Sequence, residues 1–219
     1  MSFDPLPLYL TVQISVCSAV VVVVLGTPLA WLLARKQFWG KHLVDAIVMQ
    51  PMVIPPTVLG YYLLVLFGRR SMLGQFLEDY LGLQLVFTWR GAVVAAAVAS
   101  LPLYVKPARA AIEAVDSAFE DVARLLGRSE WSVLRTVTLP LAWRGLVAGA
   151  VMAFARAMGD FGTTLMVMGS IPGRQTVSIA IYDAWQGGDL EKANMLVAIV
   201  TVFSIVVLWA VSRLTGGKI

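Results

Sequence analysis

Long apolar runs separated by short polar stretches dominate the pattern of this chain. The first run, from Leu8 to Ala34, contains no formally charged residue, and it exceeds the roughly 20 residues that a helix needs to cross the hydrocarbon core of a bilayer. Four further runs follow, and each is expected to be helical because lipid offers no hydrogen-bond partner to free backbone groups. The predicted spans are 8–34, 46–68, 91–110, 145–168 and 193–212.

The pattern therefore predicts an all-α, polytopic membrane protein whose membrane domain covers residues 8–212. Composition agrees, since hydrophobic residues make up 59% and charged residues 14% of the chain, against about 25% charged in soluble domains. The start of the chain lacks the basic residues and cleavage pattern of a signal peptide, so the first span is expected to be retained. A shorter segment, 175–186, mixes apolar and polar positions and predicts an interfacial or re-entrant helix.

The distribution of Lys and Arg predicts the orientation, because cytosolic loops are enriched in both. One set of loops holds 11 of the 17 basic residues, the other holds 5, and Arg156 lies inside a span. The richer set is expected to be cytosolic, which places the N-terminus outside and the C-terminus in the cytosol. The richer set comprises Arg35, Lys36, Lys41, Lys106, Arg109, Arg124, Arg128, Arg135, Arg144, Arg213 and Lys218, and the other comprises Arg69, Arg70, Arg90, Arg174 and Lys192.

Several function classes are disfavoured by the residues present. The basic residues lie between apolar runs rather than in a stripe, so they indicate topology and no nucleic acid partner. One Cys, Cys17, and one His, His42, provide neither a disulfide framework nor a Cys-based metal site. No Gly-x-x-x-x-Gly-Lys-[Ser/Thr] phosphate loop and no nucleophile–base pair occurs, so no catalytic residue, bound metal or ATPase activity is expected in this chain.

The longest loop of the richer set, about 113–144, contains a short amphipathic segment. Ser117 and Glu120 have the spacing of a capping box, and Gly127 suits the left-handed residue that ends a helix. So short a helix is marginal in water by itself, so it either packs under its own membrane domain or docks in a groove of a partner. Its apolar positions, spaced three and four residues apart, are Phe119, Val122, Ala123 and Leu126. A second helix is expected to begin near Ser129 and to stop at Leu139-Pro140.

Proline interrupts the second predicted span. Pro51, Pro55 and Pro56 each remove a backbone donor, so this span must kink or partly unwind. Broken backbone at membrane depth is tolerated where it is buried in protein or lines a water-filled cavity. The kink is therefore either a packed irregularity or an element of a transport pathway. Gly60 eases close helix approach in both cases.

Arg156 and Asp160 are the charges that lie well inside a predicted span. A lone Arg at mid-bilayer costs about 2.5–3.5 kcal/mol on insertion scales, and the spacing of four residues lets the two side chains pair. Two interpretations follow. The pair is a structural tie between helices, or this face lines a route along which Arg156 attracts a passing oxyanion.

The loop resembles the motif of permease subunits of ABC importers. That motif runs Glu-Ala-Ala, three residues, Gly, nine residues, Ile, one residue, Leu-Pro, and this chain has Asp121-Val122-Ala123, Gly127 and Val137-Thr138-Leu139-Pro140 at the same spacing. The resemblance implies that the short helix is a coupling helix, which sits in a groove on an ATP-binding subunit. The residues expected to take part are Ser117, Phe119, Glu120, Asp121, Val122, Ala123, Leu126, Gly127, Leu139 and Pro140.

Two further stretches resemble molybdate permeases. Residues 50–61, continuing to Gly68-Arg69-Arg70, are similar to their second span, and residues 154–162 are similar to their Ala-Arg-x-x-Gly-Glu-Phe-Gly segment with Asp in place of Glu. Tungstate and sulfate permeases share much of this pattern. The resemblance covers about residues 8–212 and implies the type I importer fold with five transmembrane helices. The pathway residues that it suggests are Pro51, Pro55, Pro56, Arg156, Gly159, Asp160 and Phe161.

The resemblance also implies the assembly around the chain. Two copies would form one pathway in the cell inner membrane, and two ATP-binding subunits would bind the ATP and Mg, so this chain itself would carry no cofactor. A soluble extracytoplasmic protein would deliver the oxyanion. An ion-coupled secondary carrier is the alternative class, but such carriers are commonly built from internal repeats, and the proline-rich span is not repeated. A membrane-embedded enzyme would need a cluster of polar groups beyond Arg156 and Asp160.

Overall fold

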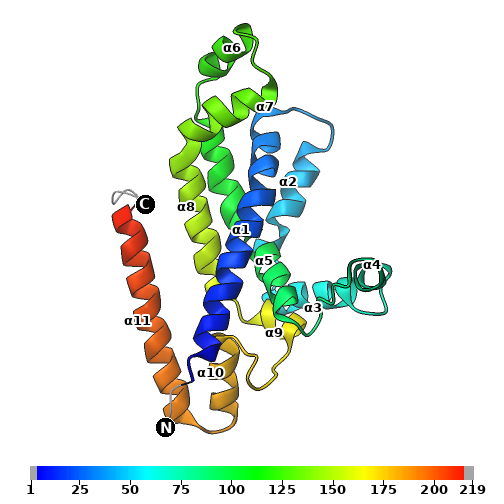
Figure 1. Ribbon diagram of the computed structural model, residues 1–219, viewed down its shortest axis with the longest axis vertical. Helices are drawn as coiled ribbons and strands as arrows, with labels where there is room; N and C mark the ends of the chain where they lie inside the picture. The colour runs from blue at the N-terminus through cyan, green and yellow to red at the C-terminus, as the bar shows by residue number, and fades with distance from the viewer. Residues whose placement is uncertain (1–3, 215–219) are drawn as a thin grey trace.

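Three long helices form the centre of the molecule. The computed structural model describes residues 4–214, which contain helices and no strand. α1 (Leu6–Arg35), α5 (Trp89–Glu113) and α8 (Leu139–Met158) pack along one another, and their buried residues form the largest apolar core (Figure 1). The other elements are α2 (Lys41–Met49), η1 (Gln50–Met52), α3 (Pro56–Phe67), α4 (Met72–Leu81), α6 (Ser117–Leu125), α7 (Glu130–Val133), η2 (Leu134–Thr138), α9 (Gly162–Met168), α10 (Val177–Gln186) and α11 (Leu190–Leu214).

Small side chains and a few polar contacts hold the bundle together. Ala92, Ala96 and Ala99 on α5 are almost fully buried, and residues of this size let helix backbones approach closely in a membrane. The Ser18 hydroxyl donates to the carbonyl of Val93 at 3.0 Å, and so joins α1 to α5. Van der Waals packing supplemented by hydrogen bonds is the expected mode of association for helices in lipid.

The second predicted span is broken, as its prolines indicate. Helical residues Lys41–Met52 and Pro56–Phe67 meet at a bend of 112°, with Pro55 at the turn and Pro56 as the first residue of α3. The range 46–68 is therefore two helices rather than one straight span. α3 turns away from the bundle and continues into α4, and the two project sideways in Figure 1.

The fourth predicted span differs from expectation at both ends. The helix does not stop at Leu139-Pro140, because a π-helical turn at Leu134–Thr138 joins α7 to α8 without a gap. The Leu139 N–H donates to the carbonyl of Leu134, five residues back, which is the π-helical pattern. The helix then ends at Met158 rather than at 168, and residues Gly162–Met168 form the separate helix α9.

The last two helices lie beside the bundle. α10 occupies part of the segment 175–186 for which an interfacial or re-entrant helix was expected, and its Val177 N–H donates to the Thr11 hydroxyl of α1 at 2.9 Å. α11 packs mainly on α10 and stands apart from the central helices (Figure 1). Large apolar side chains such as Val202 and Ile205 are exposed on it, as expected of a helix in contact with lipid or another subunit.

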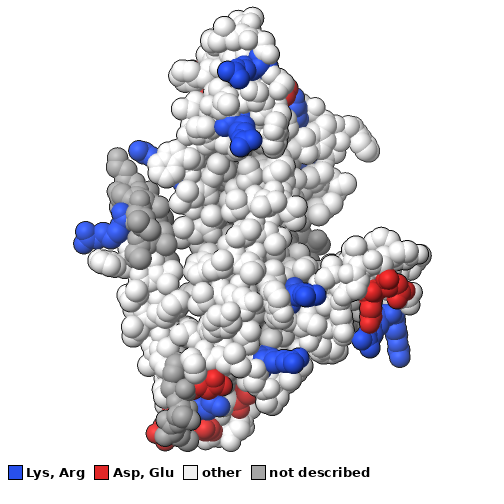
Figure 2. All heavy atoms as spheres, in the orientation of Figure 1, with Lys and Arg blue, Asp and Glu red and all other residues white. Residues whose placement is uncertain are grey.

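The described residues fit a chain that crosses a membrane several times. Four helices among the described residues are long and apolar enough to span it, and there are five if the bent pair counts as one broken span. Apart from a basic side chain at the left edge, Figure 2 shows a broad central band of the visible face without charged side chains. α1, α5 and α11 run toward the end that carries α6, and α8 runs away from it (Figure 1). Which end faces the cytosol stays a prediction from the basic residues, of which Lys218 lies outside the described residues.

Gly60 tests the packing of α3 against α9. A Cβ at this position would lie 2.7 Å from the Met166 Cβ and 3.0 Å from the Thr163 carbonyl oxygen. We expect Gly60→Val to destabilise the purified protein by about 1–3 kcal/mol, the usual cost of overpacking, and thermal unfolding in detergent measures it. The control is Val65→Ile on an exposed position of the same helix, which should leave the melting temperature unchanged. Equal melting temperatures for both variants would contradict this packing.

Candidate functional site

Helix α6 lies at one end of the molecule, above the long helices in Figure 1. Its N-terminus is capped by Asp116, whose Oδ1 accepts a hydrogen bond from the Ala118 N–H at 2.9 Å. The prediction that Ser117 caps it was wrong, because Ser117 is already the first helical residue. The capping box is also absent, because the Glu120 side chain is used elsewhere.

Gly127 ends the α6 turn as predicted. Its φ of +80° lies in the left-handed region, its N–H donates to the Arg124 carbonyl, and the Arg128 N–H donates to the Ala123 carbonyl at 3.1 Å. Glycine adopts this backbone at no steric cost. A Cβ at Gly127 would meet open space, so a larger residue here strains the backbone rather than obstructing a neighbour.

The apolar residues of α6 point away from the rest of the chain. Phe119 is 59% exposed and Leu125 is 87% exposed, and Val122 and Leu126 are also exposed, whereas Ala123 is partly buried. Leu125 was not among the positions predicted from the sequence. Leu139 and Pro140 do not belong to this exposed surface, because they begin α8 after the π-helical turn.

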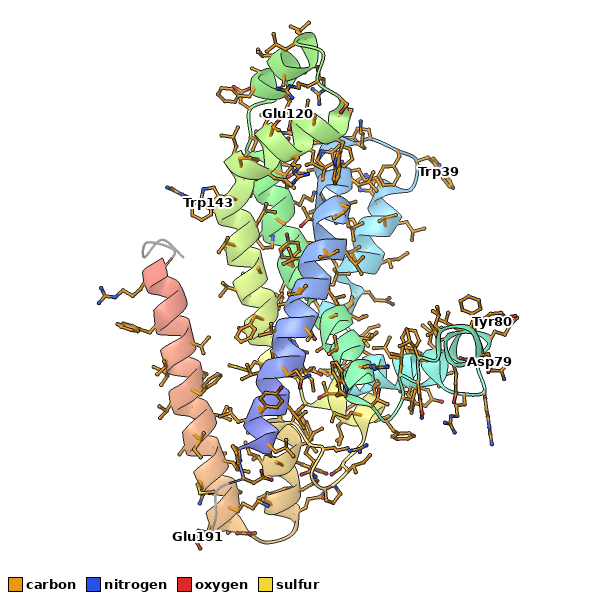
Figure 3. The ribbon with its side chains drawn as sticks, viewed as in Figure 1. Trp39, Asp79, Tyr80, Glu120, Trp143 and Glu191 are labelled. Carbon is orange, nitrogen blue, oxygen red and sulfur yellow. The ribbon has the colours of Figure 1, made fainter. Side chains whose placement is uncertain are left out.

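One polar residue of α6, Glu120, faces the bundle. Glu120 is only 2% exposed, and it lies between α6 and the ends of the helices below (Figure 3). Its Oε1 accepts from the Arg35 Nε at 3.2 Å and from the Thr138 hydroxyl at 2.7 Å. A buried carboxylate needs such partners, because desolvation of an unpaired charge is costly. Arg35 and Thr138 are thus functional candidates that sequence reasoning did not identify.

Charged residues around Arg124 close the loop that follows α6. Its guanidinium lies 2.6 Å from Asp121 and 2.7 Å from Glu130. The hydrogen bond from Arg124 lowers the pKa of Glu130, and the nearby positive charges of Arg124 and Lys36 act in the same direction. Glu130 is therefore ionised at neutral pH, and it holds the start of α7 against α6.

A second candidate site lies at the break between α8 and α9. We call it the α3–α8 recess, and it brings together Arg156, Asp160 and Phe161 with the start of α3. Pro51 and Pro55 are not among its lining residues. The recess is lined by Pro56, Thr57, Ala155, Arg156, Gly159, Asp160, Phe161 and Gly162.

Asp160 organises this break. Its Oδ1 lies 3.0 Å from an Arg156 Nη1, and its Oδ2 accepts from the Thr164 N–H at 2.9 Å. The carboxylate is fully buried, whereas the Arg156 side chain is partly exposed. Because α8 ends at Met158, the pair sits at a helix end and not within a continuous span as expected. Asp160 therefore supplies an acceptor to the otherwise free donors at the start of α9.

Neither site has the residues of a metal centre. Among residues 4–214, no group of three or more His, Cys, Asp or Glu could hold a metal ion. The first site is the exposed apolar surface of α6, which the contact between Arg35 and Glu120 attaches to the bundle. The second is the α3–α8 recess, which is lined in part by the Arg156 guanidinium.

Comparison with known sequences identifies relatives of the whole chain. The family model of the binding-protein-dependent transport system inner membrane component matches residues 26–216. The molybdenum transport system permease protein ModB of Escherichia coli K12 is 43% identical over 86% of this chain and 83% of its own length, and that of Haemophilus influenzae is 41% identical over 84% and 80%. The sulfate transport system permease protein CysT of Salmonella typhimurium is more distant, at 31% over 87% and 69%.

Solved structures share the fold. A bacterial ABC transporter that imports the acidic polysaccharide alginate superposes with a TM-score of 0.76 at 15% identity, over 97% of this chain and 79% of that one. The MetNI methionine ABC transporter in an inward-facing conformation gives a TM-score of 0.70 at 19% identity, over 96% and 94%. At these identities the likeness shows the importer permease fold alone.

Two substitutions at Asp160 test its structural role. Asp160→Asn keeps an oxygen that can accept from the Thr164 N–H, whereas Asp160→Ala removes it and also leaves Arg156 without its partner. We expect Asp160→Ala to cost about 1 kcal/mol more than Asp160→Asn, the usual value of a helix cap. Thermal unfolding of the purified variants measures the difference, and equal losses would show that the contact to α9 contributes nothing.

Proposed function

The chain belongs to the family of binding-protein-dependent transport system inner membrane components, and on that premise we propose that it is the permease subunit of an ATP-driven molybdate importer. The observation that carries the proposal is the exposed apolar surface of α6, which has no role in the fold of its own chain. Together with the 43% identity to a molybdenum permease over most of both chains, this surface supports a membrane subunit whose movement is driven by a separate ATP-binding subunit.

The α6 surface supplies the contact with the ATP-binding subunit. An amphipathic helix that offers its apolar residues to solvent fits a hydrophobic groove, and Phe119, Val122 and Leu125 are spaced three residues apart on one side of α6. This chain contains no phosphate loop, so ATP and Mg bind to the partner subunits. Their closure and opening move α6.

The α3–α8 recess contributes to the translocation pathway. Arg156 is paired with Asp160 through one nitrogen, and its partly exposed guanidinium retains donors for a passing anion. The net charge of the pair is zero, which weakens anion binding. Weak binding suits a translocation pathway, because a site that binds the anion strongly would slow its release.

The chain works within a larger assembly in the cell inner membrane. Two copies enclose one pathway, two ATP-binding subunits dock on the two α6 helices, and an extracytoplasmic protein delivers the anion at the opposite face. Molybdate is favoured over sulfate by the higher identity to molybdenum permeases than to sulfate permeases. Tungstate, with nearly the same size and charge as molybdate, is the alternative substrate.

The assembled transporter provides the test of this function. In vesicles that contain the chain with its ATP-binding subunits and binding protein, we expect molybdate uptake that requires ATP. Val122→Asp, which puts a charge on the α6 surface, should abolish both the co-purification of the ATP-binding subunits and uptake. The matched control is Trp39→Asp, an exposed apolar residue in the loop between α1 and α2 (Figure 3). Uptake without ATP, or unchanged uptake by Val122→Asp, would contradict the proposal.

Arg156→Gln tests the pathway role of the recess. Removal of the guanidinium leaves the Asp160 charge in the recess, which repels an anion. We expect a fall in molybdate uptake of about tenfold, equivalent to about 1.4 kcal/mol, with ATP hydrolysis retained. Competition by sulfate measures selectivity in the same vesicles. If Arg156→Gln and Asp160→Asn both transport at the normal rate with normal selectivity, the ion pair is a structural tie only.

A further inference from the structure

Helix α6 is attached to a helix that is remote from it in the sequence. The chain connects α6 to α5 through residues 114–116 and to α7 through residues 126–129. α1 is a neighbour in space only, and the contact is made by Arg35, its last residue. The Arg35 Nη2 lies 3.1 Å from Glu120 Oε1 and also donates to the Val115 carbonyl at 2.8 Å.

The attachment is the reverse of ordinary amphipathic packing. A helix that merely covers its own domain buries apolar residues and exposes polar ones, whereas α6 exposes Phe119 and Leu125 and buries the Glu120 carboxylate. The Arg35 Nε and Nη2 both contact the same Glu120 oxygen, at 3.2 and 3.1 Å, and hydrogen bonds between charged groups are directional. They therefore fix the position of α6 on α1 more closely than a sliding apolar contact does.

The junction joins several parts of the chain at one carboxylate. Glu120 accepts from Arg35 of α1 and from Thr138 of the π-helical turn that leads into α8, and its other oxygen lies 3.5 Å from Arg124. Any displacement of α6 that keeps these bonds must carry the end of α1 and the start of α8 with it.

α1 extends this connection to the far end of the molecule. There the Thr11 hydroxyl accepts from the first N–H of α10. On α10, the ring of Tyr182 packs on that of Phe161 with 5.1 Å between centroids, and Phe161 lines the α3–α8 recess. A continuous series of packed and hydrogen-bonded groups therefore runs from α6 through α1 to the recess, and such a series conveys coupling only if its parts move together.

We propose that Glu120 is a positioning residue that makes α6 and α1 one rigid unit, so that movement imposed on α6 by ATP reaches the opposite end of the membrane through α1. This inference rests on the proposed importer function. Glu120 acts through Arg35 and touches neither the anion nor the nucleotide. Its loss should therefore leave docking and hydrolysis in place and reduce transport per ATP.

The experiment compares uptake and hydrolysis in vesicles that contain the complete transporter. Glu120→Gln keeps the shape of the side chain and an acceptor for Thr138 but removes the charge that pairs with Arg35. We expect the ATP-binding subunits to co-purify normally and the molybdate imported per ATP to fall about tenfold, within the usual range of coupling between sites. The matched control is Glu113→Gln, because Glu113 pairs with Arg109 on its own helix α5 and should leave the ratio unchanged.

A double variant separates a shared interaction from two independent effects. Arg35→Gln with Glu120→Gln should be no worse than either single variant, because both remove the same contact. If Glu120→Gln fails to reach the membrane, Arg35→Gln alone removes the α1 partner of the same carboxylate and should lower the molybdate imported per ATP about fivefold.

Each other outcome contradicts part of the account. A normal ratio in Glu120→Gln would show that α1 is not driven through this residue. Loss of the ATP-binding subunits from that variant would show that Glu120 only shapes the docking surface, and the inference would then be wrong while the importer function stands. Absence of ATP-dependent uptake with the unaltered chain would overturn the proposed function instead.

Discussion

The requirement that backbone groups be hydrogen-bonded inside lipid governs this structure. It makes every long apolar segment helical, and it makes each interruption of a helix depend on a substitute partner. Just before Pro140, the Leu139 N–H donates to the Leu134 carbonyl in the π-helical turn, so the chain stays helical there. At the break after Met158 the substitute is the carboxylate of Asp160, which accepts from the start of α9. The interruptions are also where the chain presents its candidate functional groups, because polar side chains are brought there to complete the bonding.

The same constraint explains how one end of the molecule can be moved by another protein. α1 is one continuous helix of 30 residues that can transmit displacement along its length, although Pro28 inside it removes one backbone hydrogen bond. α6, in contrast, is a short helix outside the bundle. Its exposed apolar residues suit a partner, and its buried Glu120 holds it to Arg35 and Thr138. The exposed apolar residues of α6 thus serve for docking on a partner, and its buried Glu120 attaches it to its own chain. The proposed coupling depends on both.

Features that depend on neighbouring residues could be predicted from the sequence. Apolar runs marked the helices, the prolines marked the bend before α3, and Gly127 marked the left-handed end of α6. Where two neighbouring residues could serve the same purpose, the pattern was ambiguous. Asp116 and Ser117 are both good caps, and Asp116 was the one used. The break after Met158 was missed because the range 145–168 is apolar enough to count as one span, although Gly159, Asp160 and Gly162 lie at the break.

Contacts between residues far apart in the chain could not be predicted from the sequence. Arg35 and Glu120 are 85 positions apart, and Arg35 was read only as one of the basic residues that set the topology. The contact of Thr138 in the π-helical turn with Glu120, 18 positions away, is likewise not indicated by local spacing. The motif of the loop was recognisable from its residues, but the division of α6 into a docking side and an attached side came from the burial of Glu120.

The most direct test is a distance measurement between α1 and α6 during the transport cycle. Spin labels at Leu32 of α1 and Ala118 of α6, both exposed, in a background without Cys17, report this distance by pulsed electron resonance when labelled subunits are diluted with unlabelled ones in the complete transporter. The account predicts the same distance distribution without nucleotide and with ATP bound, because Glu120 holds the two helices together. A distribution that shifts or broadens on ATP binding would show that α6 moves independently of α1.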